Sequence, residues 1–153
     1  MKNALLFLAG WGLLLLPVAG LAQTTTYGYS GGFQYYTVPA GATSIQVVVV
    51  GASSGTNTGV NAIAGAQVTA TIPVTPGEQL AVVVGGQPAG YSAGYNGGGY
   101  PGYGSGGGGG TDIRRATANG GTGDVSGGRN ALVVAGGGGG SQLAIIGNDP
   151  GRS

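Results

Sequence analysis

Gly106-Gly-Gly-Gly-Gly-Thr-Asp-Ile-Arg114 and Ala131-Leu-Val-Val-Ala-Gly-Gly-Gly-Gly-Gly140 are the two stretches that decide the fold. In each of them a run of five glycines directly abuts a short segment that resembles a β-strand. A flexible linker would mix glycine with serine and other polar residues, and it would not meet strand-like segments so abruptly. We therefore interpret glycine in this chain as a structural component placed between strands.

Two conformations are open for these glycine runs. Glycine has the highest entropy cost of ordering, so a dense glycine segment is normally disordered, which would make this region a loose loop. Alternatively, the runs adopt extended left-handed helices of the polyproline II type, with about three residues per turn. Such polyglycine II helices lack side chains, so they can lie close together and satisfy one another's backbone groups. The sequence alone leaves both conformations open.

The glycine content divides the chain, and the regular β pattern lies mostly before the division. Residues 23–84 contain nine glycines in 62 positions, whereas residues 85–140 contain 24 in 56. The nearly continuous apolar run 45–50 predicts a strand buried on both faces, and the alternation over 67–72 predicts a half-buried strand. Further strands are predicted over these ranges: 33–38, 80–84, 131–135 and 143–146. No stretch of ten or more residues after residue 22 has helical periodicity, so the sequence predicts an all-β fold.

A turn and a domain plan follow from the same pattern. Thr75-Pro-Gly-Glu78 favours a type II turn, because Pro76 presets the first central torsion and Gly77 accepts the positive φ that follows. This turn predicts a β-hairpin over residues 67–84. Residues 23–153 are predicted to form one domain. It comprises a β core over about 30–84 and 130–146, and a glycine-rich insertion over about 85–129.

The first 22 residues are predicted to be a signal peptide. Lys2 precedes the apolar stretch 4–16, and Gly20-Leu-Ala22 supplies the small residues of a cleavage site, so the mature chain would begin at Gln23. The apolar stretch is shorter than the roughly 20 residues of a membrane-spanning helix, so no stable span is expected after cleavage. Export to the cell surface or the medium is therefore the expected localisation.

The remaining chain is almost free of charge and of reactive side chains. Residues 23–153 carry four arginines and four acidic residues, and they contain no lysine, histidine or cysteine. This balance argues against nucleic acid as a partner, because such binding requires several phosphates to be neutralised. Disulfides and sites based on a catalytic histidine or cysteine are impossible. We therefore predict a protein that is not an enzyme and has no cofactor.

Two glycine-rich matches to known site motifs do not support a site. Residues 102–107 match the dinucleotide-binding spacing G-x-G-x-x-G, but they follow no predicted strand and open no predicted helix. Residues 107–113 match the start of a calcium-binding β-roll repeat with Asp112 as the ligand, but Arg114 stands where an apolar residue is required and no second copy follows. We therefore predict no metal site. Asp112 and Arg114 are instead predicted to be structural residues, with Asp112 accepting hydrogen bonds from glycine amides and Arg114 pairing with it or with carbonyls.

Tyrosines in the glycine-rich region are the candidate ligand-binding residues. They lie among Gly, Ser, Ala, Asn and Pro, a composition that resembles the binding loops of antibodies: Tyr91, Tyr95, Tyr100 and Tyr103. The alternative is that their rings simply cover glycine backbone that has no side chains of its own. Gly137, Gly138 and Gly139 are predicted to act as scaffold wherever neighbouring backbones touch.

The order of segments resembles a known family. The segments that carry the resemblance, besides the two glycine-run stretches quoted first, occur in the order Phe33-Gln-Tyr-Tyr-Thr-Val-Pro-Ala-Gly-Ala-Thr-Ser-Ile-Gln-Val47, Val74-Thr-Pro-Gly-Glu78, Val82-Val-Val-Gly-Gly86 and Tyr95-Asn-Gly-Gly-Gly99. Over roughly residues 30–140 the chain resembles the secreted bacterial glycine-rich domain family. That family is similar to the extracellular glycine-rich domain of the anaplastic lymphoma kinase and leukocyte tyrosine kinase receptors.

The resemblance implies a jelly-roll-like (TNF-like) β-sandwich with packed glycine helices as an extension, used in extracellular recognition. Family members continue with more glycine runs, so this chain is expected to be incomplete at its C-terminus. After Val50 the chain has Gly-Ala-Ser-Ser-Gly where the family has a tryptophan and more glycine. No kinase signature is present, so receptor signalling is not implied.

Two functions are consistent with these features. The first is a recognition or adhesion module whose partner is an extracellular protein or a saccharide. The second is a structural matrix or coat protein that self-associates through its glycine-rich segments. Binding as a dispersed monomer would favour the first function, whereas concentration-dependent fibres or sheets would favour the second.

Overall fold

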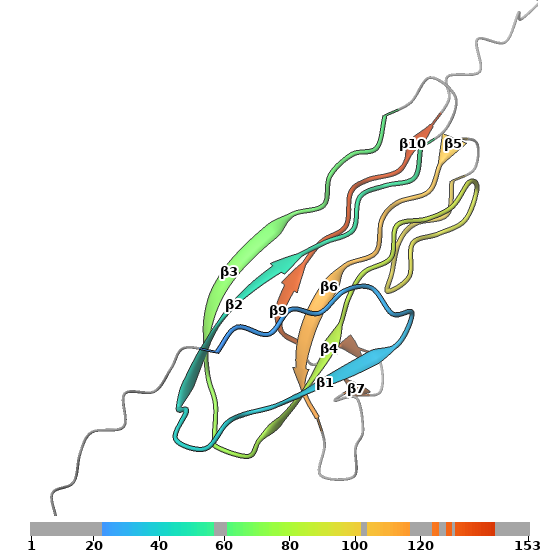
Figure 1. The fold of residues 1–153 in the computed structure, drawn as a ribbon. Coiled ribbons are helices and arrows are strands. Elements are labelled where there is room, and N and C mark those ends of the chain that lie inside the picture. The colour runs from blue at the N-terminus through green and yellow to red at the C-terminus, as the bar shows by residue number, and fades with distance from the viewer. Residues whose placement is uncertain are drawn as a thin grey trace, which may run out of the picture.

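The computed structural model describes residues 23–56, 61–101, 104–116, 124–125, 128–129 and 131–142. The predicted signal peptide and the predicted strand 143–146 lie outside these ranges. Across the described ranges every regular element is a β-strand, which confirms the all-β prediction, and no helix is long and apolar enough to cross a membrane. The fold is elongated, with strands at one end and wavy extended segments at the other (Figure 1).

The strands form antiparallel sheets. Four strands make the largest sheet in the order β1-β4-β6-β9, and their bounds are β1 Phe33–Thr37, β4 Gln79–Val83, β6 Thr111–Arg115 and β9 Ala131–Ala135. A second sheet pairs β2 (Ser44–Val50) with β3 (Gln67–Pro73). Two short pairs complete the set: β5 (Gly104–Ser105) with β10 (Ser141–Gln142), and β7 (Asp124–Val125) with β8 (Gly128–Arg129).

The hydrophobic core lies between the two main sheets. β2 and β3 contact β6 and β9 across this interior, and alternate residues of each strand point into it. The buried cluster consists mainly of branched aliphatic side chains, which suit a pleated surface: Val38, Val49, Ile72, Val74, Leu80, Val82, Ile113, Val133 and Ala135. Burial of these apolar side chains is the main contribution of the two sheets to the stability of the folded protein.

Three features of the topology differ from the sequence-based predictions. The predicted hairpin over residues 67–84 is wrong, because β3 pairs with β2 whereas β4 pairs with β1 and β6. Residues 45–50 are not buried on both faces, since Val48 and Val50 are exposed and only the alternate side chains face the core. Finally, β6 lies within the predicted insertion, yet it is an inner strand of the largest sheet. Pattern alone identified strands but could not assign their partners.

The predicted turn itself is present, as a connection between the two sheets. Glu78 N–H donates to Thr75 O at 2.9 Å, and Gly77 has a φ of 79°. Gly77 N–H also donates to Val38 O at 2.9 Å, which ties the turn to the chain following β1. A positive φ at this third position is the requirement of a type II turn.

Gly77→Val is therefore expected to lower the Tm by several degrees. A β-branched residue held at positive φ costs about 1–3 kcal/mol, and each kcal/mol shifts the Tm of a domain of this size by roughly 4 °C or more. Thermal unfolding followed by circular dichroism measures the change. Gly28→Ala is the control, since its added methyl would meet open space. An unchanged Tm for Gly77→Val would contradict the turn assignment.

Candidate functional site: a groove among glycine segments

Extended segments continue the strands beyond the β core and run side by side to the far end of the molecule (Figure 1). They occupy residues 51–56 after β2, 61–66 before β3, 84–101 after β4, 106–110 before β6 and 136–140 after β9. We call these five stretches the glycine segments, because each contains glycine and their backbones approach closely at these glycines. β5 and β10 close the far end.

Hydrogen bonds between the glycine segments follow a different spacing from those in the strands. Gly51 N–H donates to Ala66 O, and the next bond along this pair joins Ser54 N–H to Ile63 O. Likewise Ala52 N–H donates to Gly109 O, and Gly55 N–H donates to Gly106 O. In both segments of each pair, the hydrogen-bonded residues therefore recur every three positions. In a β-strand, the residues bonded to one neighbour recur every two positions.

Gly106–Gly110 lies at the centre of this arrangement. The N–H groups of Gly107, Gly108 and Gly109 donate to three different places, namely Gly99 O, Gly138 O and Gly86 O. All five glycines are buried. A methyl group added to Gly109 would overlap Tyr95 O, and one added to Gly108 would overlap Ala52 O. Glycine is required at positions 106, 108 and 109, because a backbone oxygen of a neighbouring segment already occupies the space of a Cβ atom at each of them.

Gly136–Gly140 is only partly exposed, because Gly136, Gly139 and Gly140 face solvent whereas Gly138 is buried. A methyl group at Gly137 would overlap Gly108 O, and one at Gly138 would overlap Ile63 O. At Gly136 and Gly139, which are three residues apart, a methyl group would meet nothing within 4 Å. Of the three glycines that the sequence predicted as scaffold, Gly137 and Gly138 therefore contact neighbouring backbone, whereas Gly139 faces outward.

A buried polar cluster joins the glycine segments to the β core. Arg114 Nε donates to Asp112 Oδ1 at 2.5 Å, and Arg114 Nη2 donates to Asp112 Oδ2 at 3.1 Å. Asn96 Nδ2 donates to Asp112 Oδ2 at 2.9 Å and to Gly110 O at 2.6 Å. The Arg114 guanidinium also lies 5.6 Å from the centre of the Phe33 ring, within the range of a cation–π contact.

Arg114 was predicted to pair with Asp112 or with carbonyls, and the structure pairs it with Asp112. The contact of Asn96 with Asp112 was not predicted. Asn96 has a φ of 70°, and asparagine is among the residues that tolerate this left-handed conformation. Its position before Gly97-Gly-Gly99 was the available signal. Within the described ranges, no group of three or more His, Cys, Asp or Glu side chains is placed to hold a metal ion.

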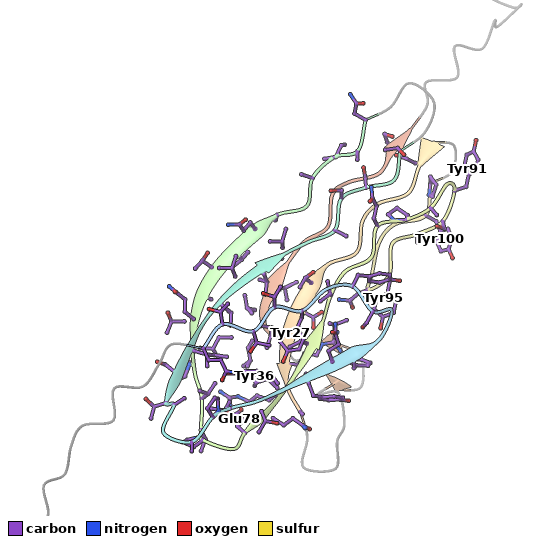
Figure 2. The ribbon with its side chains drawn as sticks, in the orientation of Figure 1. Tyr27, Tyr36, Glu78, Tyr91, Tyr95 and Tyr100 are labelled. Atoms are coloured by element: carbon purple, nitrogen blue, oxygen red, sulfur yellow. The ribbon has the colours of Figure 1, made fainter. Side chains whose placement is uncertain are left out.

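The structure does not gather the candidate tyrosines into one site. Tyr100 and Tyr91 are 83% and 68% exposed. Both lie at the glycine end of the fold (Figure 2). Tyr95 is half-buried, and its ring packs edge-on against the Tyr29 ring with the ring centroids 5.9 Å apart. This contact was not predicted from the sequence. Tyr103 lies outside the described residues. Tyr91 and Tyr100 are thus accessible to a ligand, whereas Tyr95 packs against Tyr29 beside Gly86.

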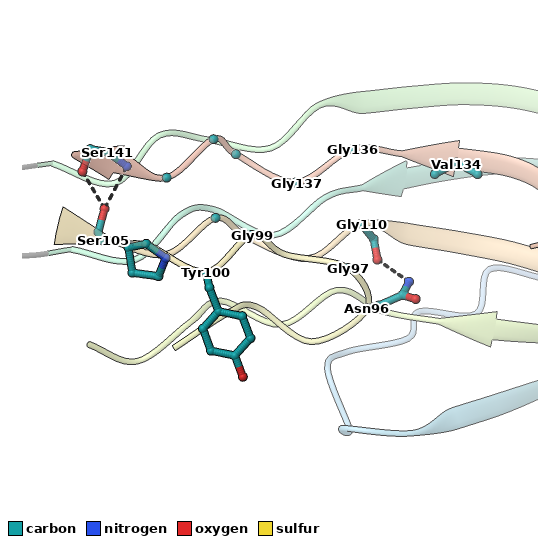
Figure 3. A pocket seen from close by; sticks show the side chains of 16 residues that line it. Asn96, Gly97, Gly99, Tyr100, Ser105, Gly110, Val134, Gly136, Gly137 and Ser141 are labelled. Atoms are coloured by element: carbon teal, nitrogen blue, oxygen red, sulfur yellow. Dashed lines mark hydrogen bonds between the residues drawn. The ribbon is translucent and has the colours of Figure 1, made fainter. Parts of the chain in front are cut away.

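Tyr100 stands on the rim of a groove of about 570 Å³ (Figure 3). Its walls come from residues 96–101 and 136–141, and its floor comes from the central glycine segment. A hydrogen bond of 2.6 Å between Ser105 Oγ and Ser141 Oγ lies at one end, and Val134 lies at the other. No charged side chain lines the groove among the described residues. It therefore offers backbone amides and carbonyls, hydroxyl groups and one aromatic ring.

The groups with shifted pKa values lie away from this groove. The Thr75 backbone N–H donates to the Glu78 carboxylate and lowers its pKa, and the Arg115 side chain adds to this effect. Burial raises the pKa of the Tyr27 phenol, as does the neighbouring Tyr36. Glu78 lies at the end of the fold opposite the groove (Figure 2).

No protein-family model, curated protein or solved structure matches this chain.

Proposed function

We propose that this protein is an exported, non-enzymatic recognition module that binds an uncharged extracellular ligand, a saccharide or a protein segment, in the groove beside Tyr100. The observation that carries the proposal is an uncharged groove with glycine backbone on its floor and an 83% exposed tyrosine on its rim. A tyrosine ring combines apolar area with a polar tip, which suits it to binding surfaces. The absence of histidine and cysteine from the sequence supports a non-enzymatic role.

We also propose that the fold is a jelly-roll-like sandwich with an extension of polyglycine II helices, as in the glycine-rich domain family that the sequence resembles. The three-residue spacing of the hydrogen bonds supports this proposal, because a polyproline II helix has about three residues per turn. None of the glycines from 106 to 110 or from 136 to 140 has a positive φ, which is consistent with that conformation. In this proposal the glycine helices are a rigid support for the groove.

Tyr100→Ala is expected to weaken ligand binding at least tenfold without lowering the Tm. The ring is largely exposed, so its removal leaves the core unchanged, whereas aromatic residues dominate many binding surfaces. Residues 23–153 can be screened on an array of glycans and an array of extracellular proteins, and hits can then be measured by titration calorimetry. Tyr91→Ala is the matched control, because Tyr91 is also exposed but does not line the groove.

Two outcomes would contradict the proposal. A confirmed hit whose affinity is unchanged by Tyr100→Ala would place recognition elsewhere. An absence of hits together with concentration-dependent assembly, measured by light scattering, would support the alternative of a self-associating matrix or coat protein.

A further inference from the structure

One long edge of β2 carries backbone groups that face away from its partner β3. Thr43 O accepts from Val74 N–H and Gly51 N–H donates to Ala66 O, so the residues of β2 bonded to β3 are the odd-numbered ones. In an antiparallel pair the alternate residues then point their N–H and C=O groups to the other side. The hydrogen bond of 2.6 Å from Thr111 Oγ1 to Val50 O confirms this direction, because Thr111 lies on β6. Ser44, Gln46 and Val48 therefore present their backbone groups at the free edge.

This free edge faces a large cleft with a mostly apolar lining. The cleft has a volume of about 1370 Å³ and follows the whole of β2. The inner face of the largest sheet contributes the half-buried side chains of Tyr36 and Val84 to its lining, above the buried core residues Leu80, Val82 and Ile113. Residues 23–27 and 39–42 also line it, and no charged side chain does so among the described residues. A strand edge of this length next to an apolar surface is a template for a further strand.

We propose that this cleft is an acceptor site for one extended β-strand, supplied by another polypeptide, that pairs with β2 and completes the sandwich. Its backbone would bond to Ser44, Gln46 and Val48, and its alternate side chains would pack on the half-buried Tyr36 and Val84. Main-chain bonds give affinity in this mode of recognition, and the pockets for alternate side chains give specificity. The uncharged lining selects a strand whose inward residues are apolar and whose outward residues are polar.

The chemistry of the site favours a strand over other occupants. A fatty acyl chain would cover the apolar lining but leave the edge N–H and C=O groups of β2 without partners, at a cost for each group removed from water. Edge-to-edge pairing of two whole copies through β2 would have to fit a second sheet between residues 23–27 and 39–42, which line the same cleft. A single strand satisfies both the polar edge and the apolar lining.

The proposal can be tested with a displayed library of random nonapeptides selected on residues 23–153. We expect selected peptides to alternate apolar and polar residues, and their binding to protect the amides of Gln46 and Val48 from hydrogen exchange. Val48→Pro removes an edge donor without touching the bonded pairs with β3, so it should weaken peptide binding roughly tenfold. Thr69→Pro is the matched control, because Thr69 lies opposite Val48 and its N–H faces away from β2.

A second measurement does not depend on the variants folding. A selected peptide can be N-methylated at alternate residues in two patterns, each blocking one of its two edges. Only the pattern that blocks the edge facing β2 should abolish binding. Equal binding of both methylated forms, or displacement by palmitate without amide protection, would show an apolar-ligand cavity and overturn the proposal. Selection of peptides without alternation would also overturn it.

Discussion

Gly109→Ala is expected to lower the Tm by about 10 °C or more, a larger effect than that of any alanine substitution on the outward face of the glycine segments. The added methyl group would overlap Tyr95 O, and no side-chain rotation can relieve the overlap because the backbone fixes the position of a Cβ atom. The surrounding chain would have to move. That movement threatens two hydrogen bonds, from Gly109 N–H to Gly86 O and from Ala52 N–H to Gly109 O. Overpacking and unsatisfied buried groups each cost about 1–3 kcal/mol.

The control for this experiment lies on the same arrangement of glycine segments. Gly139→Ala adds its methyl group to open space, so the Tm is expected to stay unchanged or to rise slightly through the entropy of the unfolded chain. Differential scanning calorimetry of the parent and both variants gives the comparison. The same geometry predicts that Gly137→Ala and Gly138→Ala each destabilise, so the triple substitution at 137–139 owes its effect to two of its three sites. A Tm for Gly109→Ala equal to that of Gly139→Ala would mean that the glycine segments are loose in solution.

Local structure was the part of this fold that the sequence predicted well. β-branched and aromatic runs located β1, β2, β3, β4 and β9 to within one or two residues, because strand propensity and alternation are local properties. The turn at Pro76-Gly77 was also predicted, since proline and glycine fix backbone torsions by themselves. The strands that the turn connects were not assigned correctly, because the same turn can join two paired strands or lead the chain from one sheet to another. Strand pairing depends on distant residues.

The candidate site was predictable only in part, for the same reason. Exposed tyrosines among small residues indicated Tyr100, but nothing local distinguished it from Tyr91 or from Tyr95, which packs against Tyr29. The groove requires three segments from residues 96–141 to lie side by side, and glycine runs carry no side-chain pattern from which that packing can be deduced. The cleft along β2 could not be predicted from the sequence either. It depends on which edge of the strand stays unpaired, a property of the sheet rather than of the residues 44–50.

The buried ion pair gives the second large effect. Asp112→Ala is expected to destabilise the protein by about 3–5 kcal/mol, because it removes the carboxylate that accepts two hydrogen bonds from the buried Arg114 guanidinium. The substitution also removes an acceptor of Asn96 Nδ2, which holds Gly110 O through its other hydrogen bond. The loss should therefore loosen the junction between the glycine segments and the β core. Chemical denaturation of the variant and the parent measures the free energy of unfolding.

Two further variants separate the charge from the packing. Arg115→Ala removes the exposed partner of Glu78 and is expected to cost less than about 1 kcal/mol, since an exposed pair contributes little. The double variant Asp112→Leu with Arg114→Met replaces both buried charges by apolar groups, so it should recover a substantial part of the stability that Asp112→Ala loses. If Asp112→Ala were no more destabilising than Arg115→Ala, the Asp112–Arg114 pair would not be buried in solution. Equal loss in Asp112→Ala and the double variant would instead mean that the hydrogen bond between Asn96 and Asp112, rather than the ion pair with Arg114, holds the glycine segments to the β core.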